Sequence, residues 1–409
     1  MRLRHLFTSI LAVALAAGMA GCQHSSAQET QAQANSSVPA ISTGIGATVI
    51  NSRDYTPAVM KLIEEAESSI GLVMHQTRYY EDYPGSESNN LCDALIAACE
   101  RGVDVTFVID ISGDDWNGSN GQNEDFGNRL AAAGARVYHD DLNRVTHTKL
   151  IVVDGVASVI ASVNWSHYSL TNNNEVGAIV WSNHAAAVCW DILAQHAASG
   201  TLKSGSPLPE SVSSVGDPFA YAAARGYEVL PSETATLLFN SDYCSGLKWL
   251  FDGAQRRIDV VQRSADHYRM RPPHAGPLPE GQTEVAMTNA LLKELIAADE
   301  RGVDVVMTLE GNVTFGDGAP PDNPNIDFGL RARSRGIDVY WDPPDAQTHA
   351  KMVMVDDSVV VGSTNWTIFA VEGVNNELSV VLRSPEIAAV YRAYIDDLQA
   401  RGSKFTEEY

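Results

Sequence analysis

Basic residues are scarce in this sequence relative to its acids. Its 409 residues include 28 Lys and Arg against 51 Asp and Glu, a formal net charge of −23 at pH 7. A field of that sign repels polyanions, so it disfavours general coating of nucleic acid and broad electrostatic docking on anionic lipid. It does not exclude a small pocket that is locally positive.

The apolar run near the N-terminus is too short to span a bilayer. Residues 6–17 follow two arginines and end in small residues before Cys22, an arrangement typical of an export signal. The end of the run resembles the lipobox of bacterial lipoproteins. By that resemblance, residues 1–21 are a signal peptide, Cys22 is acylated as the mature N-terminus, and Gln23 after it implies the outer membrane of the cell envelope. The alternative is ordinary cleavage after Ala20, which leaves a free thiol.

Cysteine is also sparse, with five in the chain. Cys92 and Cys99 lie two turns apart on one predicted helix, ~10 Å along its axis, which is too far for a disulfide between them. The sequence does not fix any other pairing that involves Cys189 or Cys244, and four buried thiols are equally compatible with it.

Hydrophobic residues, by contrast, make up 44% of the chain and charged residues 19%. That composition can bury a large core and excludes global disorder, and the length suits two domains. Residues 22–41 are polar and low in complexity, so we expect them to form a flexible tether.

The chain repeats itself at a nearly constant offset. Three short segments recur in the same order, 200 or 202 residues apart: Glu100–Val105 as Glu300–Val305, Asp125–Gly127 as Asp327–Gly329, and Thr146–Lys149 as Thr348–Lys351. Self-similarity of this kind indicates a duplicated domain. We therefore predict domain 1 at residues 42–200, a linker rich in Ser, Gly and Pro at 201–231, and domain 2 at 232–409.

Helices and strands alternate in each half. The first half predicts a helix near 57–68, a strand at 70–75, an amphipathic helix that ends at Gly102, a strand at 103–109 and a closing helix near 185–198. The second half shows the same order. This alternation favours an α/β sandwich with a largely parallel sheet in each half.

A strand, a turn and a second strand gather polar residues in each half. His147 and Lys149 are two apart in a β-branched run and share one face. Asp154-Gly155 indicates a hairpin, and the strand at 157–161 returns Ser162 and Asn164 to the same patch. Glu175 follows this hairpin, and the second half repeats the set as His349, Lys351, Asp356, Ser363, Asn365 and Glu377.

These motifs resemble those of a known family. HTKLIVVD with ASVN, and HAKMVMVD with GSTN, resemble the paired HKD motifs of the phospholipase D superfamily, His-x-Lys-x4-Asp followed by Gly-Ser-x-Asn. The resemblance implies two phospholipase D-like α/β sandwich domains with pseudo-two-fold symmetry and one shared active site. It implies no cofactor and no metal. Two departures are Ala161 in place of the first Gly, and a second hairpin one residue shorter, for which we expect a tighter turn.

Phosphodiester chemistry explains why these residue types are needed. A neutral imidazole can attack phosphorus without adding negative charge, and a second, protonated imidazole can protonate the leaving alcohol. The Lys and Asn side chains supply donors for the phosphoryl oxygens. The resemblance implies His147 as nucleophile and His349 as acid/base, although the sequence alone leaves the two roles interchangeable. Glu175 and Glu377 could each hold an imidazole N–H and set its tautomer.

Two other features could contribute to the site. The resemblance counts Asp154 and Asp356 with the catalytic set, but they have the opposite strand parity from His and Lys. We therefore expect them to cap the hairpin or pair elsewhere, and to serve folding more than chemistry. The loops that begin at His75 and His267 could line the pocket with cationic and aromatic contacts, or could be solvated.

The sequence therefore predicts a phospholipase D-type phosphodiesterase that hydrolyses or transphosphatidylates glycerophospholipids, forms phosphatidic acid through a covalent phosphohistidine, and works as a membrane-anchored monomer. A nuclease or other phosphodiesterase of the superfamily is the alternative, although the acidic balance weighs against a nucleic-acid partner. A cardiolipin synthase-like role is conceivable and less typical. A non-catalytic envelope binding protein is the alternative from another class, but neither half has lost its motif His or Lys.

Overall fold

The computed structural model describes residues 41, 44–112, 115, 118–267, 287–312 and 323–406. The predicted signal peptide, nearly all of the tether and Cys22 lie outside the described residues, as does the predicted loop after His267. The described residues belong to one compact unit that holds both halves of the repeat. Within the described ranges, none of the helices combines the length and apolar character that crossing a bilayer requires.

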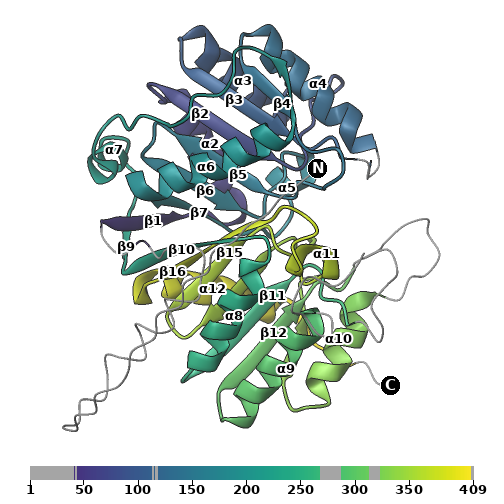
Figure 1. Ribbon diagram of the computed structural model, residues 1–409. Helices are drawn as coiled ribbons and strands as arrows, with labels where there is room; N and C mark the ends of the chain where they lie inside the picture. The colour runs from purple at the N-terminus through teal and green to yellow at the C-terminus, as the bar shows by residue number, and fades with distance from the viewer. Residues whose placement is uncertain are drawn as a thin grey trace, which may run out of the picture. The chain divides into compact units, whose positions relative to one another are not determined.

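The first half builds a sheet in the order β8-β4-β3-β2-β5-β6-β7-β1-β9 (Figure 1). Its strands are β1 (Ile45–Val49), β2 (Ser69–Met74), β3 (Asp104–Ile109), β4 (Arg136–His139), β5 (Lys149–Val153), β6 (Ala157–Ala161), β7 (Gly177–Trp181), β8 (Thr201–Ser204) and β9 (Leu230–Ser232). Its helices are η1 (Ser52–Asp54), α2 (Tyr55–Glu64), α3 (Glu87–Glu100), α4 (Ser119–Ala132), α5 (His167–Thr171), α6 (Asn183–Ser199) and α7 (Pro218–Ala224).

The second half builds a matching sheet in the order β10-β16-β15-β14-β11-β12-β13-β17. Its strands are β10 (Thr234–Phe239), β11 (Arg257–Gln262), β12 (Asp304–Leu309), β13 (Asp338–Trp341), β14 (Lys351–Val355), β15 (Ser358–Gly362), β16 (Leu378–Arg383) and β17 (Ser403–Lys404). Its helices are α8 (Asp242–Gly253), α9 (Met287–Glu300), α10 (Pro324–Arg333), α11 (Ile368–Val371) and α12 (Pro385–Arg401). The α/β class and the duplication are thus confirmed.

The prediction of a largely parallel sheet was wrong. In the described sheets, β2, β3 and β4 are parallel neighbours, as are β11, β12 and β13, and the other neighbouring pairs are antiparallel. A parallel crossover needs a dozen or more residues, usually a helix. Only residues 140–148 separate β4 from β5, so the motif strand enters the sheet antiparallel to β2.

The segment predicted as a linker is part of the first half's structure. Residues 201–231 contain β8, which pairs with β4, and β9, which pairs with β1. They also contain α7, whose Tyr221 hydroxyl donates a hydrogen bond of 2.7 Å to Asp154 Oδ2. The first sheet therefore ends at β9, immediately before β10 starts the second.

One hydrophobic core joins the two halves. A single buried cluster includes Leu150 of β5, Trp190 of α6, Met352 of β14 and Tyr391 of α12. The Tyr391 hydroxyl also donates to the backbone oxygen of Gly177 in the other half, at 2.8 Å. Because the motif strands β5 and β14 contribute to this cluster, the core fixes the two motifs relative to each other. Cys92, Cys99, Cys189 and Cys244 are all free thiols.

The two departures from the family pattern have local explanations. A Cβ on Gly362 would lie 2.3 Å from Leu378 O and 2.5 Å from Ser379 Cα, so this position requires glycine. In the first half, Ala161 instead faces Gly177 across the ladder, and that glycine leaves room for its methyl group. The shorter second hairpin pairs Val355 directly with Ser358, which confirms the tighter turn.

Candidate active site

The structure brings the two motif histidines together through contacts that cross between the halves. The Nδ1 atom of His147 lies 2.9 Å from Oε2 of Glu377, and Nδ1 of His349 lies 3.0 Å from Oε2 of Glu175. Each carboxylate therefore holds the histidine of the opposite half. Because Nδ1–H donates to the carboxylate, the lone pair of each imidazole is left at Nε2.

Each of these carboxylates is itself held by a motif serine. The hydroxyl of Ser162 donates to Oε2 of Glu175, and that of Ser363 donates to Oε2 of Glu377, both at 2.5 Å. Both glutamates are fully buried. The serines thus act on the imidazoles through the carboxylates, as supporting residues of the motif.

Two asparagines that the sequence analysis did not single out make the crossing possible. The backbone oxygen of Asn376 accepts the N–H of His147 at 2.9 Å, and its Nδ2 donates to Thr146 Oγ1 at 3.0 Å. Asn174 makes the equivalent contacts with the second motif. Its backbone oxygen accepts the N–H of His349 at 2.8 Å, and its Nδ2 donates to Thr348 Oγ1 at 3.1 Å. An Asn-Asn-Glu sequence recurs 202 residues apart, and that repeat is the signal that could have identified them.

The two motif lysines are buried beside the histidines. Lys149 and Lys351 are each 2% exposed, and each Nζ donates to the backbone oxygen of the histidine two residues before it. Burial lowers the pKa of Lys149 to about 7, although Glu377 and Glu175 oppose the shift. Burial also lowers the pKa of Lys351 well below its ordinary value. These ammonium groups are therefore poorly solvated and gain from an anionic ligand.

The motif asparagines have unsatisfied polar atoms. Asn164 follows β6 and Asn365 follows β15, and both side-chain Oδ1 atoms are buried without a hydrogen-bond partner in the described part of the structure. Such atoms are rare in folded proteins, and here they lie in the motif beside the buried lysines. The arrangement fits amides that meet a bound ligand.

The two crossing carboxylates differ in charge. Burial alone would raise the pKa of Glu175, but His349, its hydrogen bond and Lys351 outweigh burial and hold that pKa at about 2. At Glu377 burial prevails over Lys149 and raises the pKa to about 7. At neutral pH Glu175 is therefore a full carboxylate, while Glu377 is partly protonated.

Both imidazoles are neutral at pH 7 without substrate. Burial lowers the pKa of His349 to about 4, although Glu175 opposes the shift. Burial and the neighbouring Lys149 lower the pKa of His147 well below its ordinary value. An anionic phosphodiester in the site would raise both, because a nearby negative charge favours imidazolium.

The motif aspartates lie away from this cluster. Asp154 and Asp356 have positive φ angles of 52° in the hairpin turns, at the far ends of β5 and β14 from the histidines. Their carboxylates accept backbone N–H groups at the starts of β2 and β11: from Glu67, Ser68 and Ser69, and from Gln255, Arg256 and Arg257. The structure does not bring them to the reacting groups, and their contacts support the folding role expected from strand parity.

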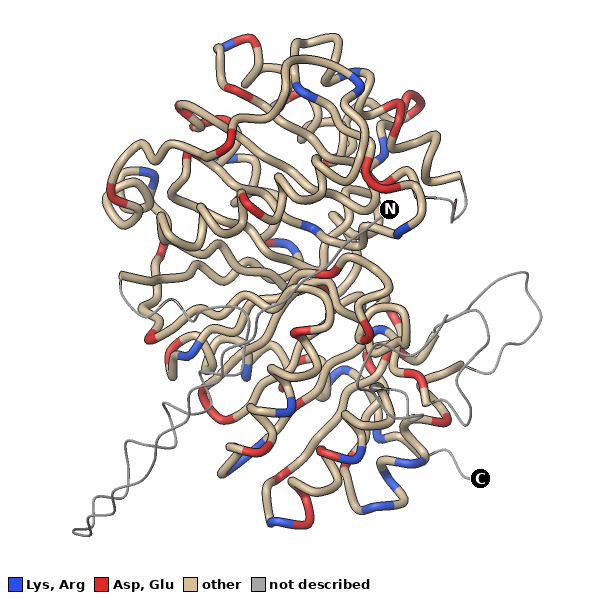
Figure 2. The backbone as a smooth tube through the Cα atoms, in the orientation of Figure 1, with Lys and Arg blue, Asp and Glu red and all other residues tan. Residues whose placement is uncertain are grey.

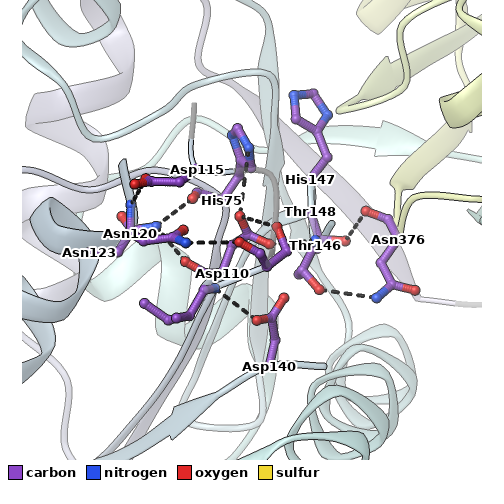
Figure 3. A network of polar contacts seen from close by, with 12 residues as sticks. His75, Asp110, Asp115, Asn120, Asn123, Asp140, Thr146, His147, Thr148 and Asn376 are labelled. Atoms are coloured by element: carbon purple, nitrogen blue, oxygen red, sulfur yellow. Dashed lines mark hydrogen bonds and ion pairs between the residues drawn. The ribbon is translucent and has the colours of Figure 1, made fainter. Parts of the chain in front are cut away.

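Buried acids that the sequence analysis missed support the start of each motif. Asp110 Oδ1 accepts the N–H of Thr146 at 2.8 Å, and Asp140 lies beside Asp110 (Figure 3). In the second half Glu310 and Asp342 make the matching contacts. These residues follow strands β3, β4, β12 and β13, so the signal was an acid directly after an apolar strand in both copies.

The acid pair in the first half predicts a pH-dependent stability. Burial and Asp110 raise the pKa of Asp140 from 3.8 to about 8. The folded state then binds this proton more tightly than the unfolded state, so the free energy of unfolding falls between about pH 4 and pH 8. In Asp140→Asn, Oδ1 still accepts from Ile111 N and the amide donates toward Asp110. We expect Asp140→Asn to raise the free energy of unfolding more at pH 8 than at pH 5, by on the order of 1–3 kcal/mol.

Urea unfolding of the wild type and Asp140→Asn at pH 5 and pH 8 measures this effect. Glu210→Gln, in an exposed part of the chain, is the matched control and should leave the pH dependence unchanged. If the free energy of unfolding depended on pH equally in Asp140→Asn and the wild type, Asp140 would not hold a proton beside Asp110 in the folded state.

A cavity of about 960 Å³ lies away from the motif groups, between α2, α3 and α5, where Arg53, Met60, Asp93 and Leu170 line it. None of the motif residues is in its wall. Over the described residues, no group of three or more His, Cys, Asp or Glu could hold a metal ion.

Comparisons with known proteins identify the family of this chain. The family model described as "Cardiolipin synthase, PLD-like domain" matches residues 59–197 and 282–399. Cardiolipin synthase A of Cronobacter sakazakii is 31% identical over 97 residues, and the same values hold for the enzyme of Salmonella arizonae. The matched segment covers 23% of this chain and 19% of the relative's length.

Solved structures share the fold. Phosphatidylserine synthase of Haemophilus influenzae Rd KW20 is similar with a TM-score of 0.64 and 13% sequence identity, over 92% of each chain. Polyphosphate kinase of Porphyromonas gingivalis is similar with a TM-score of 0.50 and 12% identity, over 86% of this chain and 46% of the kinase. At these identities the likeness concerns the fold alone. Because the family model covers both halves, the chain belongs to the phospholipase D-like family as a member with two duplicated domains.

Proposed function

We propose that this chain is a phospholipase D-type phosphodiesterase that hydrolyses glycerophospholipids to phosphatidic acid or transfers their phosphatidyl group to an alcohol. The crossed pairing of His147 with Glu377 and of His349 with Glu175 carries the proposal, because it gives one site two oriented imidazoles. The name of the relative, cardiolipin synthase, refers to a phospholipid and supports that substrate class.

The proposed reaction has two displacements at phosphorus. Nε2 of His147 attacks the phosphorus, a P–N bond forms, and the P–O bond to the headgroup alcohol breaks as that oxygen takes the proton from Nε2 of His349. Water or an alcohol then attacks the phosphorus and gives its proton to His349, and the P–N bond breaks. Lys149, Lys351 and the motif asparagines stabilise the phosphoryl oxygens through both steps.

A vesicle assay tests the substrate class. Protein from Gln23 onward, which retains the compact unit, is mixed with vesicles of phosphatidylethanolamine and phosphatidylglycerol in EDTA, and mass spectrometry follows phosphatidic acid. We expect phosphatidic acid in EDTA, and none from His147→Ala. Added glycerol with vesicles of phosphatidylethanolamine alone separates the two reactions, because transfer would then produce phosphatidylglycerol at the expense of phosphatidic acid. Absence of any lipid product would contradict the proposed substrate.

A nuclease or another phosphodiesterase is the second candidate within the family. Lys and Arg are dispersed among Asp and Glu over both halves (Figure 2), whereas phosphate contacts along a nucleic acid require clustered basic residues. Single-stranded DNA and aryl phosphodiesters complete the assay. Turnover there without lipid turnover would favour this candidate, and inertness towards every substrate would favour a binding protein.

Anion affinity should decrease above neutral pH. Burial holds the pKa of Lys149 at about 7, so this ammonium group loses its proton above that pH. Glu377, whose pKa is about 7, ionises over the same pH range, and its negative charge also weakens the binding of an anion. Sulfate keeps a constant charge over this pH range. We expect its inhibition constant to stay unchanged below about pH 6.5 and to rise by up to about tenfold per pH unit above about pH 7.

Competitive inhibition of aryl phosphodiester cleavage measures the sulfate constant from pH 5.5 to 9. In Lys149→Gln sulfate should bind weakly at every pH, with a shallower pH dependence. A constant sulfate affinity across this range in the wild type would contradict the assignment of Lys149 to the anion site.

We also propose that acylated Cys22 anchors the protein at the bacterial outer membrane, beside its lipid substrate. The lipobox-like sequence supports this location, and the acyl chains would act as the anchor. Cys22→Ser should move the protein from the membrane fraction to the soluble fraction of the envelope. An unchanged distribution would contradict the lipid anchor.

A further inference from the structure

Four residues other than glycine have left-handed backbone angles in the described chain. They are Ser52, Asp154, Asn240 and Asp356, with φ between 47° and 54°. A side chain makes this conformation unfavourable, and it persists where the surrounding structure holds it. Asp154 and Asp356 are the matched motif aspartates of the two hairpin turns. Ser52 and Asn240 lie outside the motifs and need a separate explanation.

Ser52 and Asn240 occupy the same place in the repeat. Ser52 lies between β1 and α2, and Asn240 lies between β10 and α8. β1 pairs with β7, and β10 pairs with β16. These partner strands begin shortly after Glu175 and Glu377 respectively. Each left-handed residue therefore lies beside one of the two crossing glutamates.

Asn240 holds the backbone of Glu377 through two hydrogen bonds. Its N–H donates to Glu377 O at 3.0 Å, and its side-chain Oδ1 accepts the Glu377 N–H at 2.8 Å. Ser52 makes the same two contacts with Glu175. Its N–H donates to Glu175 O at 3.1 Å, and its Oγ accepts the Glu175 N–H at 3.2 Å. Among the described residues, the backbone groups of the two glutamates have no other hydrogen-bond partner.

These contacts explain why the two left-handed positions carry a polar side chain. Glycine adopts a left-handed angle without steric strain. A glycine here would leave the N–H of the glutamate without its acceptor, however, and both glutamates are fully buried. A buried N–H without a partner is unfavourable. The side-chain oxygen thus supplies what the strained backbone alone does not.

The backbone segments held in this way carry the carboxylates that meet the imidazoles. Glu377 Oε2 lies 2.9 Å from His147 Nδ1, and Glu175 Oε2 lies 3.0 Å from His349 Nδ1. A carboxylate orients an imidazole only when its own backbone is held in place. Each left-handed residue therefore acts, through the glutamate of its own half, on the histidine of the opposite half.

We propose that Ser52 and Asn240 are positioning residues for the two imidazoles. Asn240 fixes Glu377 so that the lone pair of His147 faces the phosphorus. Ser52 fixes Glu175 so that His349 faces the oxygen of the leaving alcohol. Both act through the glutamates and are not themselves reacting groups. The inference rests on the proposed function, because it takes the two imidazoles as the groups that react.

Proton NMR of protein with isotopically labelled histidine tests the two positions without any substrate. An imidazole Nδ1–H that donates to a carboxylate gives a signal far downfield of other N–H protons. The loss of one signal in His147→Asn and of the other in His349→Asn assigns them. We expect Asn240→Gly to shift or broaden the His147 signal and to leave the His349 signal unchanged. Ser52→Gly should do the reverse.

Steady-state cleavage of a nitrophenyl phosphodiester measures the consequence for the reaction. Asn240→Gly should lower kcat by about tenfold, the size of one hydrogen bond. KM should be unchanged, because the motif lysines and asparagines stay in place. The relieved strain and the lost hydrogen bond have opposite effects on stability. The unfolding temperature should therefore stay within about 4 °C of the wild type.

Two further variants serve as controls. Asn240→Ser returns a side-chain oxygen of the kind that the first half uses at Ser52, and kcat should then recover to within about threefold of the wild type. Ser211→Gly, at an exposed serine, should leave both NMR signals and kcat unchanged.

The inference would be overturned if Asn240→Gly and Ser52→Gly shifted both histidine signals together or shifted neither. Wild-type kcat in Asn240→Gly would also overturn it. Loss of the folded state in either variant would do the same, because the side chain would then serve folding and not the imidazole. Signals that respond in the crossed pattern, in a wild-type protein that cleaves no phosphodiester, would instead contradict the proposed function.

Discussion

Replacing His147 with Ala is expected to reduce phosphodiester turnover by about 10⁴-fold or more, because the atom that bonds to phosphorus is lost. The fold should tolerate the change. The lost side-chain contacts are the edge-to-face contact with the His75 ring and the hydrogen bond to Glu377, whose carboxyl is already partly protonated at neutral pH. Steady-state rates on vesicles and on aryl phosphodiesters, with thermal unfolding of each variant, measure the two effects.

The exposed His184 on α6 supplies the matched control for this substitution. His184→Ala should leave both the rate and the unfolding temperature close to those of the wild type. A His147→Ala protein that keeps more than about a tenth of wild-type turnover would remove His147 from the reaction.

Replacing Glu377 with Gln is expected to lower kcat by about 10²- to 10⁴-fold, although the substitution is nearly isosteric. The Gln amide can donate to Nδ1 of His147, which places the imidazole proton on Nε2. The lone pair needed for attack on phosphorus is then absent. The half that contains Glu377 would thus control the reactivity of a histidine in the other half.

Single-turnover rates at saturating substrate measure the effect of Glu377→Gln on the chemical step separately from its effect on substrate binding. Glu210→Gln, in an exposed part of the chain, should behave as the wild type. If Glu377→Gln lowered affinity alone, with the chemical step unchanged, the carboxylate would serve binding and not the tautomer of His147.

Local patterns in the sequence were sufficient to predict the motif residues. Alternation in the β-branched run placed His147 and Lys149 together, and the hairpin signal at Asp154 led to the strand 157–161 as the structure has it. Opposite parity also separated Asp154 from the reacting groups. These features depend on neighbours within about 20 residues, where strand and turn periodicity applies.

Contacts between distant segments were not predictable in this way. The sequence suggested that a glutamate could hold each imidazole, but not that Glu377 reaches His147 across 230 residues. Strand periodicity fixes the face on which a side chain lies, whereas the partner of a β-strand depends on chain reversals elsewhere. The antiparallel entry of β5 and the unpredicted strands β7 and β16 have the same origin.

Locating the covalent intermediate tests the proposed mechanism most directly. Wild-type protein is mixed with a nitrophenyl phosphodiester, quenched at neutral to alkaline pH during turnover, digested and analysed by peptide mass spectrometry. We expect the substrate's phosphoryl group on the peptide that contains His147, and its loss in His147→Asn. A phosphoryl group on another residue, or turnover with no modified peptide, would contradict the proposed mechanism.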